Sequence, residues 1–304
     1  MTTATLSRSR AGELSWDVIL RPVEHRDGAH AARIVYEAFA DIHDHHRFAR
    51  DFPTREAATQ LVEAFIDHPR IWGVVAEADG RIVGSNFLDE RGPITGVGPI
   101  TVDPEAQGAR VGRRLMEAVL QRGRDARGVR LLQDSFNTAS LSLYASLGFD
   151  PREPIALLGG PVNAEVPDRI EVRPAQRDDL AACEALSLRV HGYERTNELA
   201  DAIDSPGLSP FVTIRDGRVT AYATTLAFFP AAHAVAESDE SMQALIAGAV
   251  AATGAPAAFL LPVRQAELFR WCLHAGLRVV KPMTYMTVGE YREPRGSWIP
   301  SVLY

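Results

Sequence analysis

The chain has 304 residues, of which 46% are hydrophobic and 23% charged, and its formal net charge is −7. At about 150 residues per domain, this length predicts two globular domains. The acidic balance disfavours nucleic acid as a partner and weakly favours a cationic one. No apolar run approaches the ~20 residues of a membrane span, and the two cysteines do not suggest a disulfide scaffold or a metal site.

The first half is predicted to alternate strands and helices. Residues 1–16 have no apolar core of the signal-peptide type, so we expect a short disordered lead and a cytoplasmic protein. Two β-rich runs flank Ala-Asp-Gly, which is a hairpin signal. In chain order we expect a strand at 17–22, helices near 29–40 and 54–67, strands at 71–77, 81–88 and 94–102, a helix at 111–124, a strand at 129–135 and a helix at 138–147.

The most specific signal is the turn between the strand Ile94–Val102 and the helix that starts at Val111. Gln107, Gly108 and Gly112 stand in or beside this turn. A strand that passes through small residues into a helix points several free backbone N–H groups, and the positive end of the helix dipole, at one spot. The turn therefore predicts a binding site for a phosphate or pyrophosphate.

Residues 107–112, Gln-Gly-Ala-Arg-Val-Gly, resemble motif A of the GNAT superfamily, the acetyl-CoA-dependent N-acetyltransferases. The family pattern is Gln/Arg-x-x-Gly-x-Gly/Ala after Val-x-Pro. Arg110 stands where the first motif glycine usually lies. A positive φ there would cost a non-glycine residue free energy, whereas a helical φ would cost none. Arg110 and Arg113 can add charge-assisted contacts to a diphosphate.

A second segment resembles motif B of the same family. Asn137, Ser140, Tyr144, Gly148 and Phe149 stand at the family's spacings. Asn137 can cap a helix or bond a ligand amide, Ser140 and Tyr144 share one helix face, and Gly148 can end the helix. Tyr144 alone would be read as a half-buried ring. With both motifs in order, the resemblance covers nearly the whole first half.

The second half reads as a shorter copy of the first. Arg173-Pro174 repeats Arg21-Pro22. Strands at 211–214 and 218–225 flank Arg-Asp-Gly, and helices follow near 239–252 and 265–275.

The second copy lacks the phosphate signal. Its corresponding loop, residues 236–240, has no glycine and three carboxylates, which would repel a pyrophosphate. Cys272 takes the place of Tyr144, and Gln265 that of Asn137. We expect this copy to bind no CoA at the usual place and to serve as a structural partner and wall of the acceptor cleft.

The predicted fold class is α/β (α+β), with two tandem GNAT folds, each a mixed, mostly antiparallel sheet flanked by helices. The predicted divisions are the lead at 1–16, a catalytic GNAT domain at 17–158, a linker at 159–168 and a degenerate GNAT-like domain at 169–304. The C-terminal tail is aromatic and interrupted by prolines, whereas free tails are usually polar. We expect it to pack in a groove on the first domain or on a second subunit.

The resemblance implies direct transfer of an acetyl group from acetyl-CoA to a primary amine. A backbone N–H of the 94–102 strand would stabilise the carbonyl oxygen, and Tyr144 would protonate the leaving thiolate, with pKa values of ~10 and ~8.5 for the two groups. The implied cofactor-binding residues are Ile100, Thr101, Val102, Gln107, Gly108, Ala109, Arg110, Val111, Gly112, Arg113, Asn137 and Tyr144.

The general base has several candidates. Asp89 and Glu90 follow the 81–88 strand, and Asp134 lies at the end of the 129–135 strand. An ordered water relay is the remaining possibility. Each of these carboxylates, taken alone, reads as a solvated loop charge.

His43, His45 and His46 fall between the first two predicted helices. They cannot all face one ion from a regular helix, so we predict no metal and read this segment as a polar loop that frames the acceptor. The predicted partners are acetyl-CoA and an amine, a small molecule rather than a protein, with neither nucleic acid nor membrane, and the protein is expected to be a monomer or homodimer. The alternative function is a non-catalytic acyl-CoA sensor or interaction protein on the same fold.

Overall fold

The computed structural model describes residues 18–107 and 110–303. The expected lead at 1–16 and two of the predicted cofactor residues, Gly108 and Ala109, lie outside this range. The elements of the first half are β1 (Val18–Pro22), η1 (His25–Asp27), α1 (Gly28–His46), α2 (Arg55–Asp67), β2 (Ile71–Ala78), β3 (Arg81–Asp89), β4 (Ile94–Val97), β5 (Thr101–Val102), η2 (Pro104–Ala106), α3 (Val111–Arg122), β6 (Gly128–Asp134), α4 (Thr138–Ser146) and β7 (Asp150–Gly160).

The second half follows the same order of elements, except that among its described residues nothing corresponds to β5 and η2, and one additional strand ends it. Its members are β8 (Ile170–Pro174), η3 (Arg177–Asp179), α5 (Leu180–Val190), α6 (Asn197–Asp204), β9 (Phe211–Arg215), β10 (Arg218–Ala223), β11 (Ala234–Ala236), α7 (Asp239–Thr253), β12 (Ala257–Pro262), α8 (Ala266–His274), β13 (Arg278–Gly289) and β14 (Ser297–Ile299). Among the described residues, no helix combines the length and apolar character that a bilayer crossing requires. The predicted division at residues 159–168 remains a prediction; β7 ends at Gly160 and β8 begins at Ile170.

The opening turn of each half is built in the same way. Arg21 lies 2.6 Å from the Asp27 carboxylate, and Arg173 lies 2.7 Å from the Asp179 carboxylate. Each aspartate also accepts a hydrogen bond from the backbone N–H three residues before it. This reciprocal cap fixes the strand-to-helix turn at equivalent places, and so supports the repeat that the sequence predicts.

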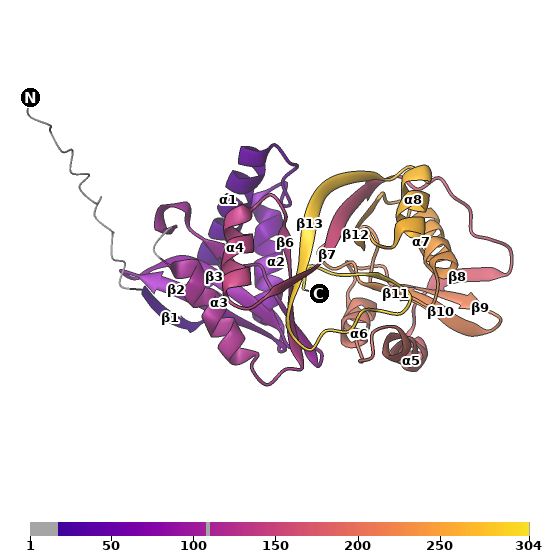
Figure 1. Ribbon diagram of the computed structural model, residues 1–304, viewed down its shortest axis with the longest axis horizontal. Coiled ribbons are helices and arrows are strands. Elements are labelled where there is room, and N and C mark those ends of the chain that lie inside the picture. The colour runs from indigo at the N-terminus through magenta and orange to yellow at the C-terminus, as the bar shows by residue number, and fades with distance from the viewer. Residues whose placement is uncertain (1–17, 108–109, 304) are drawn as a thin grey trace, which may run out of the picture.

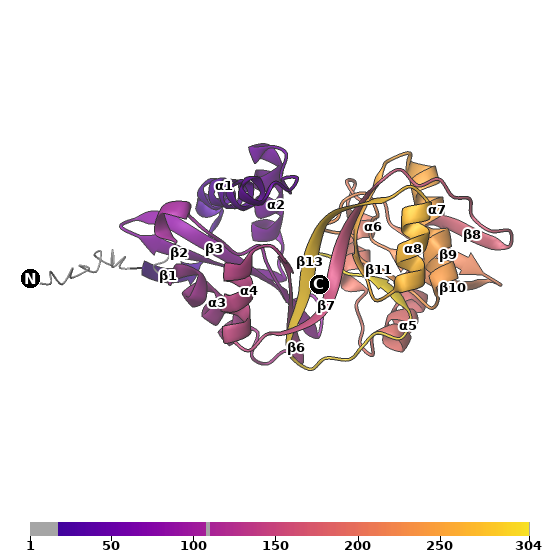
Figure 2. The same cartoon turned by 45° about the horizontal axis from the view of Figure 1, so that its top comes forward.

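Helices cover both faces of the first half's sheet. On β2, Val74 and Ala76 share a core cluster with Leu115 of α3, whereas Val75 shares one with Ile34 of α1. Side chains alternate along a strand, so neighbouring residues reach opposite faces. Helices α1 and α2 therefore lie on one side, and α3 and α4 on the other (Figure 2).

The last strand of each half pairs with the other half. β13 pairs with β6, from Met283–Asp134 to Gly289–Gly128, and β7 pairs with β12. The two exchanged strands also pair with each other, so one sheet runs in the order β1-β2-β3-β4-β6-β13-β7-β12. Figure 1 shows β7 and β13 crossing the middle of the molecule. Residues of β13 thereby lie beside the first half's own strands.

The predicted strand at 94–102 is interrupted. β4 pairs in parallel with β6 only as far as Val97–Leu131, and β5 pairs with β3 instead. β6 continues to Asp134. The prediction of one continuous strand at 94–102 was therefore wrong. β4 and β6 separate after Val97, where the predicted strand is interrupted.

Two further expectations can be compared with the structure. α1 extends to His46, so the histidine segment is the end of a helix and not the predicted loop.

The C-terminal tail packs, as predicted, but against both halves: β14 pairs with β11 of the second half. A Cβ on Gly96 of β4 would lie only 1.5 Å from the Leu303 carbonyl oxygen, so the tail also reaches the first half.

Candidate active site

A cleft of about 870 Å³ opens where β4 and β6 part, and both halves line it. One end, called the α3 end below, is lined by residues from 97–102, 106–107, 110–113 and 137–144. The other, called the α1 end, is lined by residues of α1 and α2, the loop 51–53 and, from the second half, residues 227–230. Residues 131–134 of β6 line the cleft as well.

The α3 end has an open helix N-terminus. The residue before the helix, Arg110, adopts φ 61° and ψ 12°, and its side chain caps no backbone N–H. The first N–H groups of α3 have no intrahelical partner and remain available to an anion. The left-handed conformation of Arg110 is the one that disfavours a non-glycine residue, by about 1 kcal/mol.

Gly112 lies at the second position of α3. A Cβ there would meet Leu143 and Val102 at 3.6 Å, which is ordinary van der Waals contact. Packing within the protein therefore does not require glycine at this position, whereas close approach of a ligand would. Arg113 donates to the Ser146 hydroxyl at 2.6 Å, and Gln107 approaches the Val102 carbonyl at 3.5 Å.

Helix α4 contributes Asn137 and Tyr144. The Asn137 carboxamide oxygen accepts from the Ser140 backbone N–H at 3.1 Å, so Asn137 caps the helix as one of its two predicted roles requires. Tyr144 is 6% exposed and lines the cleft. Burial, with a smaller effect from the charge of Asp134, raises the pKa of Tyr144, which keeps its phenol protonated.

Four ionisable side chains from distant parts of the chain meet at the α1 end. The Lys281 ammonium, on the exchanged strand β13, lies 2.7 Å from a carboxylate oxygen of Asp51 and 2.7 Å from one of Asp134. It also lies 3.1 Å from Nε2 of His43, whose Nδ1 is 2.7 Å from the Phe39 carbonyl. The side chains of Lys281 and His43 are fully buried. We call His43, Asp51, Asp134 and Lys281 the buried tetrad.

The two carboxylates of the tetrad are shifted in opposite directions. Burial raises the pKa of Asp134, although Lys281 opposes the rise. Burial would also raise the pKa of Asp51, but its contacts with His43 and Lys281 lower it overall. The pKa of His43 is raised: burial works against the charged ring, and the Asp51 contact outweighs burial. Asp134 is therefore the better proton acceptor of the two carboxylates.

His43, Asp51 and Asp134 are also close enough to hold a metal ion, with one ligand atom of each within 4.8 Å of the others. The Lys281 ammonium contacts both carboxylates and the imidazole, so it supplies positive charge at this place. The prediction that no metal binds remains a prediction.

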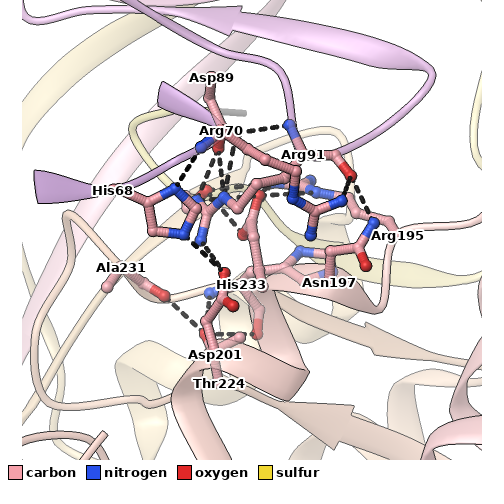
Figure 3. A network of polar contacts seen from close by, with 12 residues as sticks. His68, Arg70, Asp89, Arg91, Arg195, Asn197, Asp201, Thr224, Ala231 and His233 are labelled. Carbon is pink, nitrogen blue, oxygen red and sulfur yellow. Dashed lines mark hydrogen bonds and ion pairs between the residues drawn. The ribbon is translucent and has the colours of Figure 1, made fainter. Parts of the chain in front are cut away.

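Asp89 and Glu90, two predicted catalytic residues, do not line the cleft. Asp89 forms an ion pair at 2.6 Å with Arg91, and Glu90 one at 2.8 Å with Arg122 of α3. Figure 3 shows Asp89 and Arg91 in a network with Asp201 of α6, which Arg91 contacts at 3.0 Å. Both carboxylates are thus neutralised by arginines, and Asp89 helps to hold the two halves together.

The model of the Acetyltransferase (GNAT) family matches residues 34–149. We call residues 34–149 the GNAT domain, after the family model that they match. The mycothiol acetyltransferase of Nocardia farcinica is 31% identical over 132 residues, which are 41% of this chain and 42% of that protein. The match to this curated relative therefore spans less than half of its length.

Solved structures extend the likeness of fold beyond the GNAT domain. A provisionally assigned acetyltransferase from Pyrococcus horikoshii has a TM-score of 0.71 at 15% identity, covering 96% of this chain and 97% of that one. A tandem GNAT protein from the clavulanic acid biosynthesis pathway has a TM-score of 0.57 at 12% identity, covering 90% and 98%. The fold of both halves is thus found in other chains of this kind.

In the second half, the place that corresponds to the GNAT domain's cleft is occupied by the chain itself. β14 lies along β11 and contacts β12, the counterparts of β4 and β6. Gln265, the counterpart of Asn137, bonds the backbone N–H and C=O of Trp298 at 2.9 and 2.8 Å. Ser297 donates to Asp239 in the first turn of α7. The tail thus fills this site.

Sequence reasoning missed Asp51 and Lys281. Lys281 is the only lysine in the sequence, where all 31 other residues in the Lys+Arg total of 32 are arginine. A β-bulge leaves Val280 unpaired and precedes the buried lysine. A single lysine in a chain that otherwise uses arginine was the sequence signal that could have identified Lys281. Lysine carries a compact charge that suits a buried cluster of ionisable groups.

Proposed function

We propose that this chain is an acetyl-CoA-dependent N-acetyltransferase that acts on a primary amine, with its active site in the GNAT domain. The supporting observation is that one cleft is lined by the open N-terminus of α3, the parted strands β4 and β6, Tyr144 and Asp134. A cytoplasmic location and a small-molecule acceptor are part of this proposal.

The cofactor occupies the α3 end in this proposal. The N–H groups of Val111 and Gly112 and the side chains of Arg110 and Arg113 hold the pyrophosphate. The pantetheine chain runs along residues 100–102, which line the cleft beyond the last β4–β6 pair, Val97–Leu131. A backbone N–H of this segment stabilises the negative charge that develops on the thioester oxygen.

Asp134 is the proposed base, in place of Asp89 and Glu90. It takes a proton from the acceptor ammonium, and the neutral amine then attacks the thioester carbon. The C–N bond forms as the C–S bond breaks, the departing thiolate takes the proton that the acylated nitrogen loses, and Asp134 releases its own proton to solvent. Lys281 acts as a positioning residue, because its ammonium opposes the rise that burial causes in the pKa of Asp134.

Tyr144 donates a hydrogen bond to the departing sulfur. Since burial raises its pKa, complete proton transfer to the thiolate is less favourable than the free groups would suggest. The role that fits this environment is a donor that stabilises the thiolate as it forms. A charge-assisted hydrogen bond of this type contributes about 1.5–3 kcal/mol.

Tyr144→Phe tests this role and separates an enzyme from an acyl-CoA sensor. The phenyl ring keeps the edge contact with Phe149, so the fold is retained. We expect kcat to fall by about 10–100-fold while the Kd for acetyl-CoA stays within twofold. Thiol release in the presence of an amine, together with calorimetric titration, measures both quantities. Wild-type protein that binds acetyl-CoA but releases no thiol with any amine would be the sensor.

A further inference from the structure

We infer that the acceptor is an apolar primary amine of the arylalkylamine class. Its ammonium faces Asp134 and its apolar body lies in the α1 end. This inference rests on the proposed function, because it concerns the acceptor of the same reaction. Two observations support it: the apolar side chains that line the α1 end, and the acidic side chains among them.

The α1 end is lined mainly by apolar side chains, and five of them are phenylalanines. Phe39, Phe52 and Phe65 come from the first half, and Phe228 and Phe229 come from the loop 227–230 of the second half. Phe228 is 47% exposed, which is unusual for a phenylalanine, and it faces the cleft. Phenyl rings bind apolar groups through contact area and ring packing. They offer no hydrogen-bond partner for the hydroxyl groups of a sugar, whose burial would then be unfavourable.

The charged side chains that line the α1 end are acidic, although the buried Lys281 beside them offsets part of their charge. Among the described residues that line the cleft, the acidic side chains are Asp41, Asp51 and Asp134, and the basic ones are Arg110 and Arg113. Both arginines belong to the α3 end. Lys281 lies behind the carboxylates, and both Asp51 and Asp134 already contact it.

This distribution favours a cationic group and disfavours a carboxylate, and the apolar lining disfavours a second charged group. An ammonium near Asp134 gains a partner, whereas a carboxylate beside it would meet like charge without a lining arginine or lysine at that end. An amino acid has both groups on one carbon and would carry its carboxylate into this region. An amine with an aromatic or alkyl body has only the favourable group.

The acceptor also contacts the second half in this arrangement. Phe229 of that half lies under the Lys281 ammonium, with 5.7 Å from Nζ to the ring centroid. The loop 227–230 therefore spans from the tetrad to the exposed ring of Phe228. This gives the second half a function that does not require a cofactor of its own.

The test compares four acceptors with the full chain and saturating acetyl-CoA: phenethylamine, phenylalanine, glucosamine and spermidine. We expect kcat/KM for phenethylamine to exceed that for each of the others by about 100-fold or more. Acetyl-CoA binding is measured in parallel by calorimetry. A preference for any of the other three, or binding without turnover of phenethylamine, overturns the acceptor class and leaves the cofactor site intact. Failure to bind acetyl-CoA overturns the proposed function itself.

Phe228→Ala tests whether the second half contributes to binding of the acceptor. We expect the KM for phenethylamine to rise about tenfold or more, from the loss of buried apolar area, with no change in the Kd for acetyl-CoA. Leu188→Ala is the matched control, because Leu188 is an equally exposed apolar residue, 46%, on α5. An unchanged KM in Phe228→Ala would show that the acceptor does not reach this loop.

Discussion

Asp134→Asn is expected to lower kcat at neutral pH by about 10²–10⁴-fold, the range that a general base contributes. Asparagine has nearly the shape of aspartate but cannot take a proton from the acceptor ammonium. The loss should shrink as the pH rises, because a growing fraction of the amine then arrives neutral and needs no base. This pH dependence distinguishes a base from a residue that only supports the fold.

Asp125→Asn is the control for Asp134→Asn. Asp125 is an exposed aspartate outside the cleft, so the kcat profile of this variant should follow the wild type. In the wild type, activity should fall on the acid side at a pH above the usual range of an aspartate, because burial raises the pKa of Asp134. A deficit in Asp134→Asn that is the same at every pH would assign the base elsewhere.

Lys281→Met is expected to lower the free energy of unfolding at pH 7 by about 3–5 kcal/mol, the usual cost of leaving buried charges unpaired. Two carboxylates, Asp51 and Asp134, would lose an ammonium at 2.7 Å. The folded-state pKa of Asp51 would rise above its unfolded value, and that of Asp134, which burial already raises, would rise further. The loss of stability should therefore be largest above the folded pKa values and shrink as the pH falls and the carboxylates are protonated.

Two further variants make the Lys281→Met experiment specific. Arg127→Met removes an exposed ion pair with Glu290 at 2.6 Å and should cost no more than about 1 kcal/mol. Adding Asp51→Asn to Lys281→Met should recover part of the lost stability, because one unpaired carboxylate is gone. Denaturant unfolding from pH 5 to pH 8 measures all of them. A deficit in Lys281→Met that does not depend on pH, or no recovery in the double variant, would contradict the tetrad.

The parts of the site that the sequence predicted are those encoded locally. The turn into α3, the Asn137 cap and the approach of Tyr144 to the cleft each depend on a few neighbouring residues. Their geometry follows from helix periodicity and from unpaired N–H groups at a helix start. The sequence left the sign of φ at Arg110 open, and the structure shows that φ is positive.

The parts that the sequence did not predict depend on pairings between distant segments. No local pattern shows that β13 inserts between β6 and β7, so Lys281 could not be placed beside Asp134. Asp89 was a reasonable candidate from its position at the end of a strand. It pairs, however, with Arg91, two residues away, which also contacts Asp201 of the second half. Tertiary contacts are therefore the ground on which we propose Asp134 as the base in place of Asp89.

Calorimetric titration of acetyl-CoA into the full chain tests the central claim most directly. We predict one binding site per chain, because the tail fills the corresponding place in the second half, and we predict that Gly112→Glu abolishes the heat of binding. The glutamate would place a negative charge at the N-terminus of α3. Gly112→Ala is the matched control for folding. Two sites per chain, or unchanged affinity in Gly112→Glu, would contradict the account.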